Sequence, residues 1–160
     1  MTDLDAGNLF EQINEKKAEL DRIIKELGER AIKEYLQEFW DRNPDIAGLK
    51  WNQYTPYFND GDPCVFRVGE VRFRFSDTRE DGGDYEDGYE DSWSYGYHRY
   101  PDLKREDRDA ALEAIPEYVA AKKLSGIWQN NEMTLLSVFG DHVQITADRE
   151  KIDVDEYYHD

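Results

Sequence analysis

The sequence has little of what most catalytic and metal-binding sites require. Its single cysteine, Cys64, excludes an intramolecular disulfide and a cysteine-rich zinc site. The three histidines, His98, His142 and His159, lie far apart, and none has a second histidine or cysteine at ligand spacing. No P-loop, G-x-G-x-x-G, H-E-x-x-H or G-x-S-x-G motif occurs. We therefore expect no metal site, no cofactor and no enzymatic activity.

Long apolar runs and basic charge are also scarce. No stretch approaches the roughly 18 apolar residues of a membrane span, and the acidic first residues lack the apolar run of a signal peptide. We expect a cytoplasmic protein with no membrane partner. Twenty basic residues stand against 37 acidic ones, which gives a net charge of -17. This charge argues against direct binding to nucleic acid or anionic lipid over a broad face.

What the sequence does contain fits one folded domain. A chain of 160 residues is about the length of a single domain. Leucine, isoleucine, valine and phenylalanine make up 34 of those residues, just above the fraction of about 20% at which disorder becomes the better expectation. Eleven tyrosines and four tryptophans favour a folded chain, because disordered chains contain few aromatic residues.

A long amphipathic helix is predicted first along the chain. Apolar residues recur at three- and four-residue steps from Leu9 to Trp40, with Asn8 as the expected N-cap and Asn43-Pro44 as the stop. About 35 residues would span roughly 50 Å, more than the width of a domain of this size. The helix therefore projects, breaks near Gly28, or packs against a second copy. A homodimer through residues 8–42 is one alternative, and a helix packed on the core is the other.

The rest of the chain predicts an α+β fold. We expect an antiparallel sheet of about four or five strands, the long N-terminal helix, and a second helix interrupted by proline. Residues 1–44 form the helix and residues 45–160 the α+β body of one domain. In the first part of the body we expect a loop over 51–62 and then a hairpin of strands 64–68 and 71–75 across Gly69-Glu70. A third strand or ordered loop over 93–100 follows, and then a helix over 105–123 that Pro116 kinks or divides. The chain ends with a second hairpin of strands 133–139 and 142–147 across Gly140-Asp141 and a terminal strand over 152–157.

The negative charge is concentrated in two segments. Residues 77–92 hold eight acids and one base, and residues 148–160 hold six acids and two bases, which together supply -11 of the net charge of -17. We interpret 77–92 as a mobile loop, since it has no apolar face to bury. Folding alone does not favour such clustering, because like charges repel one another. Either the loop only keeps the protein soluble, or it docks a basic protein partner through acids and neighbouring aromatic residues: Asp81, Asp84, Tyr85, Glu86, Asp87, Tyr89, Glu90, Asp91 and Trp93.

We also considered a calcium site, a general base and a nucleophile. An EF-hand counted from Asp84 fails, because its fifth position is Gly88 and its twelfth is Tyr95. His142 beside Asp141 could be a general base, but an exposed turn histidine is the expected reading. For Cys64 we expect a small buried strand residue rather than a nucleophile. A further alternative is an enzyme or small-ligand binder that uses the loop over 51–64 as a pocket wall, with a pocket lined by Trp51, Tyr54 and Tyr57.

Two stretches resemble a group of small uncharacterised bacterial and phage proteins. They are Trp51-Asn52-Gln53-Tyr54-Thr55-Pro56-Tyr57-Phe58-Asn59-Asp60-Gly61-Asp62-Pro63-Cys64, and Phe139-Gly140-Asp141-His142-Val143 followed by the ending Glu156-Tyr157-Tyr158-His159-Asp160. The resemblance implies a prokaryotic or phage cytoplasmic setting and assigns no catalytic residue. We therefore expect a non-enzymatic acidic binding protein of the kind that mimics nucleic acid or inhibits a basic host or defence protein. The alternative is a structural or virion-associated protein that oligomerises through its N-terminal helix.

Overall fold

The computed structural model describes residues 3–57, 60–76 and 88–158, and it confirms the α+β fold. The chain begins with α1 (Asp3–Arg42), a helix of 40 residues that spans about 60 Å. It starts earlier than predicted, so Asn8 lies inside the helix and does not cap it. The predicted stop is confirmed, and Asn43 closes the last turn by donating from its backbone N and its Nδ2 to the Phe39 carbonyl, at 3.0 and 2.9 Å.

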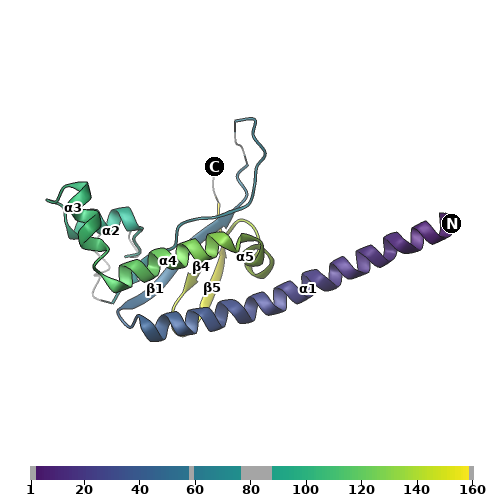
Figure 1. Ribbon diagram of the computed structural model, residues 1–160, viewed down its shortest axis with the longest axis horizontal. Helices are drawn as coiled ribbons and strands as arrows, with labels where there is room; N and C mark the ends of the chain where they lie inside the picture. Colours follow the sequence, from purple (N-terminus) through teal and green to yellow (C-terminus); the bar gives the residue numbers. More distant parts are fainter. Residues whose placement is uncertain (1–2, 58–59, 77–87, 159–160) are drawn as a thin grey trace.

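The two halves of α1 have different surroundings. The C-terminal half buries Ile32, Leu36, Phe39 and Trp40 against the body. The N-terminal half extends away from every other described element (Figure 1). Of the three alternatives for the long helix, a break near Gly28 is wrong, because the helix continues through this residue. A Cβ at Gly28 would lie 2.7 Å from Thr134 Cγ2, so the glycine allows a close approach to α5 (Glu132–Phe139).

A five-stranded antiparallel sheet forms the other layer. Its central strand is β1 (Ile46–Tyr54), which pairs on one edge with β4 (Val143–Ala147), and β4 pairs with β5 (Ile152–Glu156). The expected loop over 51–62 is therefore wrong for its first four residues, which belong to this strand. The terminal strand is confirmed as β5.

The predicted hairpin over residues 64–75 is wrong. Its two strands, β2 (Arg67–Val68) and β3 (Arg72–Phe75), pair one after the other with the second edge of β1. Three residues separate them where β1 has two between the matching positions, so the chain makes an irregular step there. The Gly69 N–H follows the same edge by donating to the Asn52 carbonyl at 2.8 Å. Gly69-Glu70 thus interrupts one strand and does not reverse the chain.

Two segments without a predicted helix are helical. The segment 93–100, expected as a strand or an ordered loop, lies in α2 (Ser92–Arg99) up to Arg99, although its alternating aromatic residues are typical of a strand. Residues 133–139 fall in α5, which ends at Gly140 with φ of 93°. The second predicted hairpin is therefore a helix followed by a strand. A glycine just past a helix is a recognised stop signal, and it could have revealed α5 from the sequence.

The proline-interrupted helix is confirmed as two helices, α3 (Arg105–Leu112) and α4 (Pro116–Asn130). Pro116 takes the first position of α4, where its missing N–H costs nothing. The second helix continues past the predicted end at Lys123.

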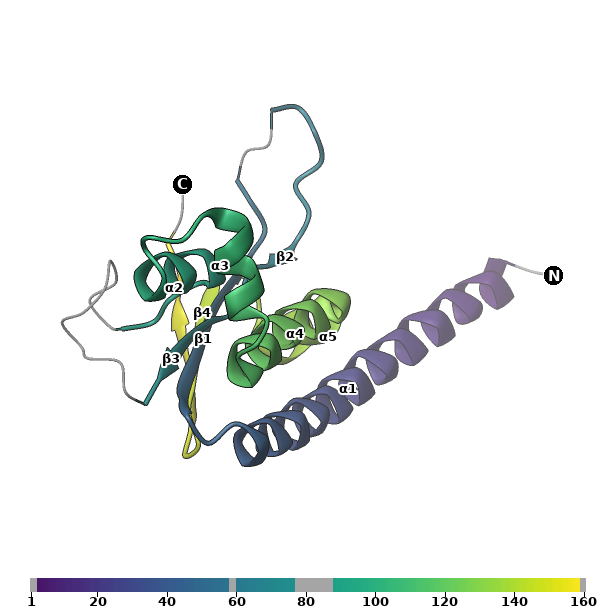
Figure 2. The same ribbon diagram turned by 60° about the vertical axis from the view of Figure 1, so that its left-hand side comes forward.

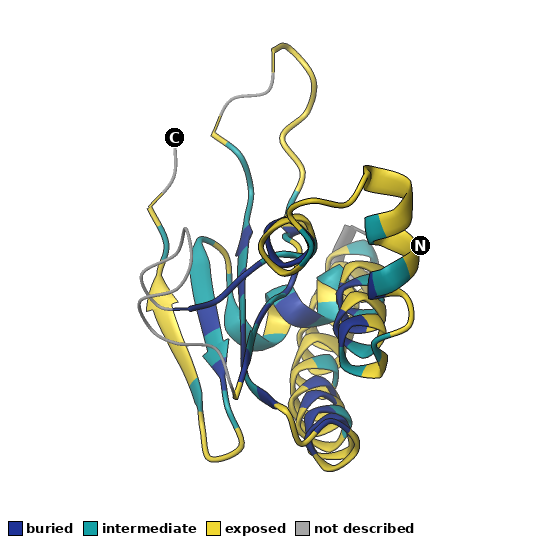
Figure 3. Ribbon diagram, turned by 90° about the vertical axis from the view of Figure 1, so that its left-hand side faces the viewer, coloured by how far each residue is buried: buried dark blue, intermediate teal, exposed yellow. Residues whose placement is uncertain are grey.

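The core lies between the sheet and the helices α1, α4 and α5, which share one side of it (Figures 2 and 3). Trp51 on β1 is fully buried, and its ring meets Trp128 of α4 and Phe139 of α5 at 5.8 and 6.0 Å between centroids. A second aromatic group joins β3 to α2 and α4, with Phe75 stacked on Tyr95 at 4.9 Å. Three of the four tryptophans, Trp40, Trp51 and Trp128, and the tyrosines Tyr95 and Tyr118 therefore belong to the core.

Candidate interaction surfaces

The predicted acidic binding segment divides into two parts. Asp81, Asp84, Tyr85, Glu86 and Asp87 lie outside the described residues, whereas Tyr89, Glu90, Asp91 and Trp93 are described. The described part forms an antiparallel bridge from Glu90 to Phe73, on the edge of β3 that does not pair with β1, and leads into α2.

Tyr89 is a packing residue and not an exposed anchor, so its predicted role is wrong. Its side chain is 5% exposed and lies where a Cβ at Gly48 would be. Lys50 Nζ and the Arg74 guanidinium lie 4.9 and 5.3 Å from its ring centroid. Two cations over one ring hold this segment against the sheet.

Glu90 is also buried, at 7% exposure, which contradicts its predicted place on an open surface. Its backbone exchanges two hydrogen bonds of 2.9 Å with Phe73. Its Oε1 lies 2.6 Å from His98 Nδ1, and Ser94 Oγ lies 3.5 Å from the same nitrogen. A serine–histidine–carboxylate relay needs the serine and the carboxylate on opposite ring nitrogens. This group is therefore a structural contact.

Asp91 and Trp93 begin α2 with different roles. Asp91 is the N-cap, and its Oδ1 accepts from the Ser94 N–H at 2.7 Å. Trp93 is 69% exposed and stacks on Tyr97, with 5.6 Å between ring centroids and 9° between planes. Of the four described candidates, Trp93 is the one available as an exposed aromatic contact.

The Asp141–His142 pair does not have the geometry of an oriented base. His142 Nε2 lies 3.7 Å from Asp141 Oδ2, and its ring stacks on Tyr57 at 4.9 Å. The Asp141 oxygens instead accept from the Thr55 N–H at 2.8 Å and the Thr55 hydroxyl at 2.7 Å. Burial raises the pKa of Asp141, but these bonds and the one from the His142 N–H outweigh it, so the pKa lies below its ordinary value. Asp141 ties the end of β1 to the turn after α5.

Two other sequence expectations are wrong. Cys64 is exposed and lies outside the strands, because the strand begins only at Arg67. Trp51 cannot line a ligand pocket, because its ring is enclosed by the core. Tyr54 packs on Tyr157 at 5.4 Å, and Tyr57 is exposed. In the described parts of the chain, no group of three or more histidine, cysteine, aspartate or glutamate residues could hold a metal ion.

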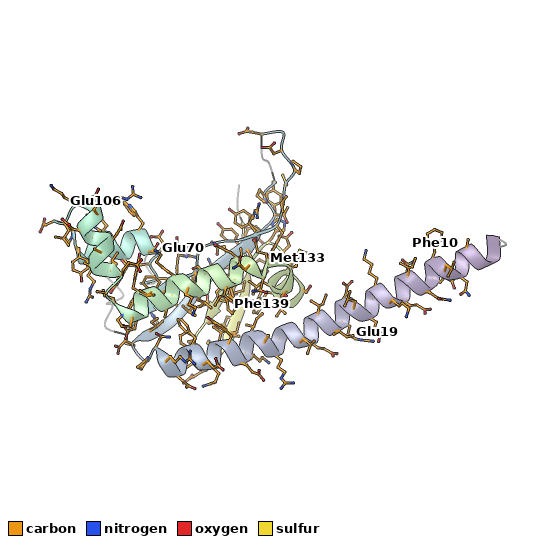
Figure 4. All side chains as sticks on the ribbon, viewed as in Figure 1. Phe10, Glu19, Glu70, Glu106, Met133 and Phe139 are labelled. Atoms are coloured by element: carbon orange, nitrogen blue, oxygen red, sulfur yellow. The ribbon has the colours of Figure 1, made fainter. Side chains whose placement is uncertain are left out.

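The most unusual surface runs along α1, from its projecting half to the residues beside α4 and α5. Side chains on one stripe of this helix, which we call the α1 seam, follow steps of three, seven, four and three residues: Phe10, Ile13, Leu20, Ile24 and Leu27. Four of them are between 55% and 68% exposed, and Ile24 is half-buried. Leu9 and Ile23 widen the stripe. Figure 4 shows Phe10 far from the sheet and from α5. Such a run of exposed apolar residues makes the α1 seam a candidate interaction surface.

The α1 seam leads directly into a groove of about 360 Å³ between α1 and the pair α4–α5. Its lining is mainly apolar and comes from all three helices: Ile24, Leu27, Gly28, Ala31, Ile32, Tyr35, Ile127, Trp128, Asn131, Thr134 and Leu135. Trp128 is 3% exposed, and its Nε1 has no hydrogen-bond partner among the described residues. The seam and the groove thus form one continuous apolar surface.

Comparisons with protein families, curated proteins and solved structures found no match for this chain. Among the described residues, no helix is both long enough and apolar enough to cross a membrane.

Proposed function

We propose that this protein is a non-enzymatic assembly protein that associates with itself through α1. The observation that carries the proposal is the α1 seam, an apolar stripe on a helix that leaves the body. In proteins, most helix stability comes from packing an amphipathic face. The projecting half of α1 packs against no other described element, so a partner would supply that stabilisation.

The energetic gain from covering the α1 seam is substantial. Burying one leucine, isoleucine or phenylalanine side chain fully contributes about 1.5–3 kcal/mol. The seam offers five such side chains in each copy, and four of them are more than half exposed. A second helix with the same spacing would cover them without any change in the body.

The experiment is a mass measurement by size exclusion with light scattering on the full chain. We expect a dimer at micromolar concentration and a monomer for Ile13→Asp, which places a charge at an exposed apolar position of the seam. Ala18→Asp adds the same charge to a different face of the same helix, where residue 18 is exposed, and should leave the dimer intact. A wild-type monomer at every concentration up to about 100 μM would contradict the proposal.

A second candidate function is docking of a basic protein by the acidic segment. In this proposal the protein is a cytoplasmic, phage-type nucleic-acid mimic that inhibits a basic nucleic-acid-binding host or defence protein. The observation that favours it is exposed Trp93, stacked on Tyr97 directly after the densest run of acids. Aromatic contacts would provide affinity, and the charge would raise the association rate.

The test spares Glu90 and Asp91, whose side chains make contacts in the described fold. In the test variant Asp81, Asp84, Glu86 and Asp87 become Asn or Gln, while Glu90 and Asp91 are kept. Its control makes the same change in Asp102, Glu106, Asp107 and Asp109, which are exposed on or beside α3. Basic proteins retained from a bacterial lysate at low salt and released at high salt should be lost only with the first variant. Equal retention by both variants would exclude the acidic segment as the site.

A further inference from the structure

We infer that two copies pair through antiparallel α1 helices, so that the first turns of each helix cover the groove beside Trp128 in the other copy. This inference rests on the proposed self-assembly and adds the orientation and the residues in contact. The occupant of the seam and the groove is a second copy of this chain.

The α1 seam follows a heptad repeat through most of the projecting half. Phe10, Lys17, Ile24 and Ala31 occupy the a positions, and Ala6, Ile13, Leu20 and Leu27 the d positions. In an antiparallel pair, a positions face d positions. Phe10 then lies opposite Leu27 of the partner subunit, and Ile13 lies opposite Ile24 of the partner subunit. Four of the five seam side chains, all except Leu20, thereby meet an apolar neighbour.

Lys17 distinguishes the two orientations. It is the one charged residue in the repeat from Ala6 to Ala31. A parallel pair would place Lys17 against Lys17 of the partner subunit inside the seam, where like charges repel each other. An antiparallel pair places it against Leu20 of the partner subunit, so its stem is covered. Its ammonium group then points toward Asp21 of the partner subunit, at the flanking e position. Two such charge pairs form in one dimer.

The charge of the bodies favours the same orientation. The eleven acids and seven bases of α1 account for -4 of the net charge of -17, so the rest of each chain carries -13. Parallel helices would bring two such bodies together at one end, at a cost in repulsion. Antiparallel helices place the bodies at opposite ends of the pair.

The groove shows where the first turns of the partner helix would lie. Leu27 and Ala31 belong both to the repeat and to the groove lining. In the antiparallel register they face Phe10 and Ala6 of the partner subunit. The partner helix therefore passes from the seam onto the groove, between α1 and the wall formed by Trp128 and α5.

The orientation can be measured as a distance between spin labels in the full chain carrying Cys64→Ser. Glu19 lies near the centre of the antiparallel overlap, so labels at Glu19→Cys should be about 20 Å apart, roughly two helix diameters, in either orientation. Asn8 would face Glu29 of the partner subunit. Labels at Asn8→Cys should therefore lie more than about 30 Å apart if the helices are antiparallel, and about 20 Å apart if they are parallel.

The two distances test the antiparallel orientation and self-assembly through α1 separately. A short distance at position 19 with a long one at position 8 supports the inference. Short distances at both positions overturn the antiparallel arrangement but leave self-assembly through α1 standing. No dipolar coupling at either position refutes both.

A pair of exposed substitutions tests the groove. Ala31 is exposed and lines the groove, so Ala31→Glu should raise the dimer dissociation constant at least about tenfold, with an unchanged circular dichroism spectrum. Met133 is 70% exposed on α5 and lies outside the groove lining, so Met133→Glu should have no effect. Equal dissociation constants for the two variants would show that the partner does not reach the groove.

Discussion

Gln53 is the polar centre of the core, and replacing it tests how the sheet is joined to α5. Its side chain is fully buried on β1. Its Nε2 donates to the carbonyls of Leu135 and Gly140, at 3.0 and 2.8 Å, and its Oε1 accepts from Trp51 Nε1 at 3.2 Å. The substitution Gln53→Met keeps the length of the side chain and removes all three bonds.

The expected loss follows from the groups left without a partner. The Trp51 N–H loses its acceptor and the Gly140 carbonyl loses a donor, and each such buried group costs about 1–3 kcal/mol. The carbonyl of Leu135 lies inside α5, where the helix offers it a second donor. After a gain of about 1 kcal/mol for the more apolar side chain, we expect a net loss of about 3 kcal/mol. For a chain of this size the melting temperature should fall by about 6–12 °C.

Urea unfolding of wild type and variant measures this difference in the free energy of unfolding. The control is Gln144→Met on the neighbouring strand β4. Gln144 is half-buried and makes a 2.8 Å bond to Asn52 Oδ1, so its replacement should cost about 1 kcal/mol or less. Equal losses for the two variants would refute the idea that Gln53 is a special buried junction.

Three further predictions concern local contacts. Asp91→Ala should destabilise the protein by about 1 kcal/mol through loss of the α2 N-cap, whereas Asp91→Asn should restore most of it in urea unfolding. The lowered folded-state pKa of Asp141 means that its stabilising effect is present above the ordinary value of 3.8 and is lost as the pH falls through the folded pKa. The difference in the free energy of unfolding between wild type and Thr55→Val should therefore shrink below about pH 4. A difference that stays constant with pH would contradict the stabilising role of ionised Asp141. Gly28→Ala should lower the melting temperature although alanine favours helices by about 1 kcal/mol, because its Cβ would lie 2.7 Å from the stiff β-branched Thr134. A rise in melting temperature would show that α5 shifts to make room for the new Cβ at no net cost in stability.

For several helices and strands, neighbouring residues were sufficient to predict where the element begins or ends. Asn43-Pro44 ends α1, and Pro116 starts α4, because proline restricts its own backbone and that of the residue before it. The alternation of the terminal strand is also local. The spacing of the α1 seam is the part of the candidate interaction surface that the sequence reveals by itself.

Long-range contacts decided the rest. The run Met133–Phe139 is short and apolar, and such a run does not distinguish a strand from a helix by its spacing. The choice depends on packing against α1 and on the stop at Gly140. Likewise, Trp51 and Gln53 lie in a polar and aromatic stretch typical of a loop. They are central strand residues because α4, α5 and β4 enclose them.

The sequence by itself determined the α+β class, the ends of the proline-limited helices, the negative charge and the apolar repeat of α1, since each depends on neighbouring residues or on composition. The tertiary structure alone decided which of these apolar and acidic residues are exposed. It buried Tyr89 and Glu90 against the sheet and left the α1 seam uncovered, because burial depends on segments that are distant in the chain.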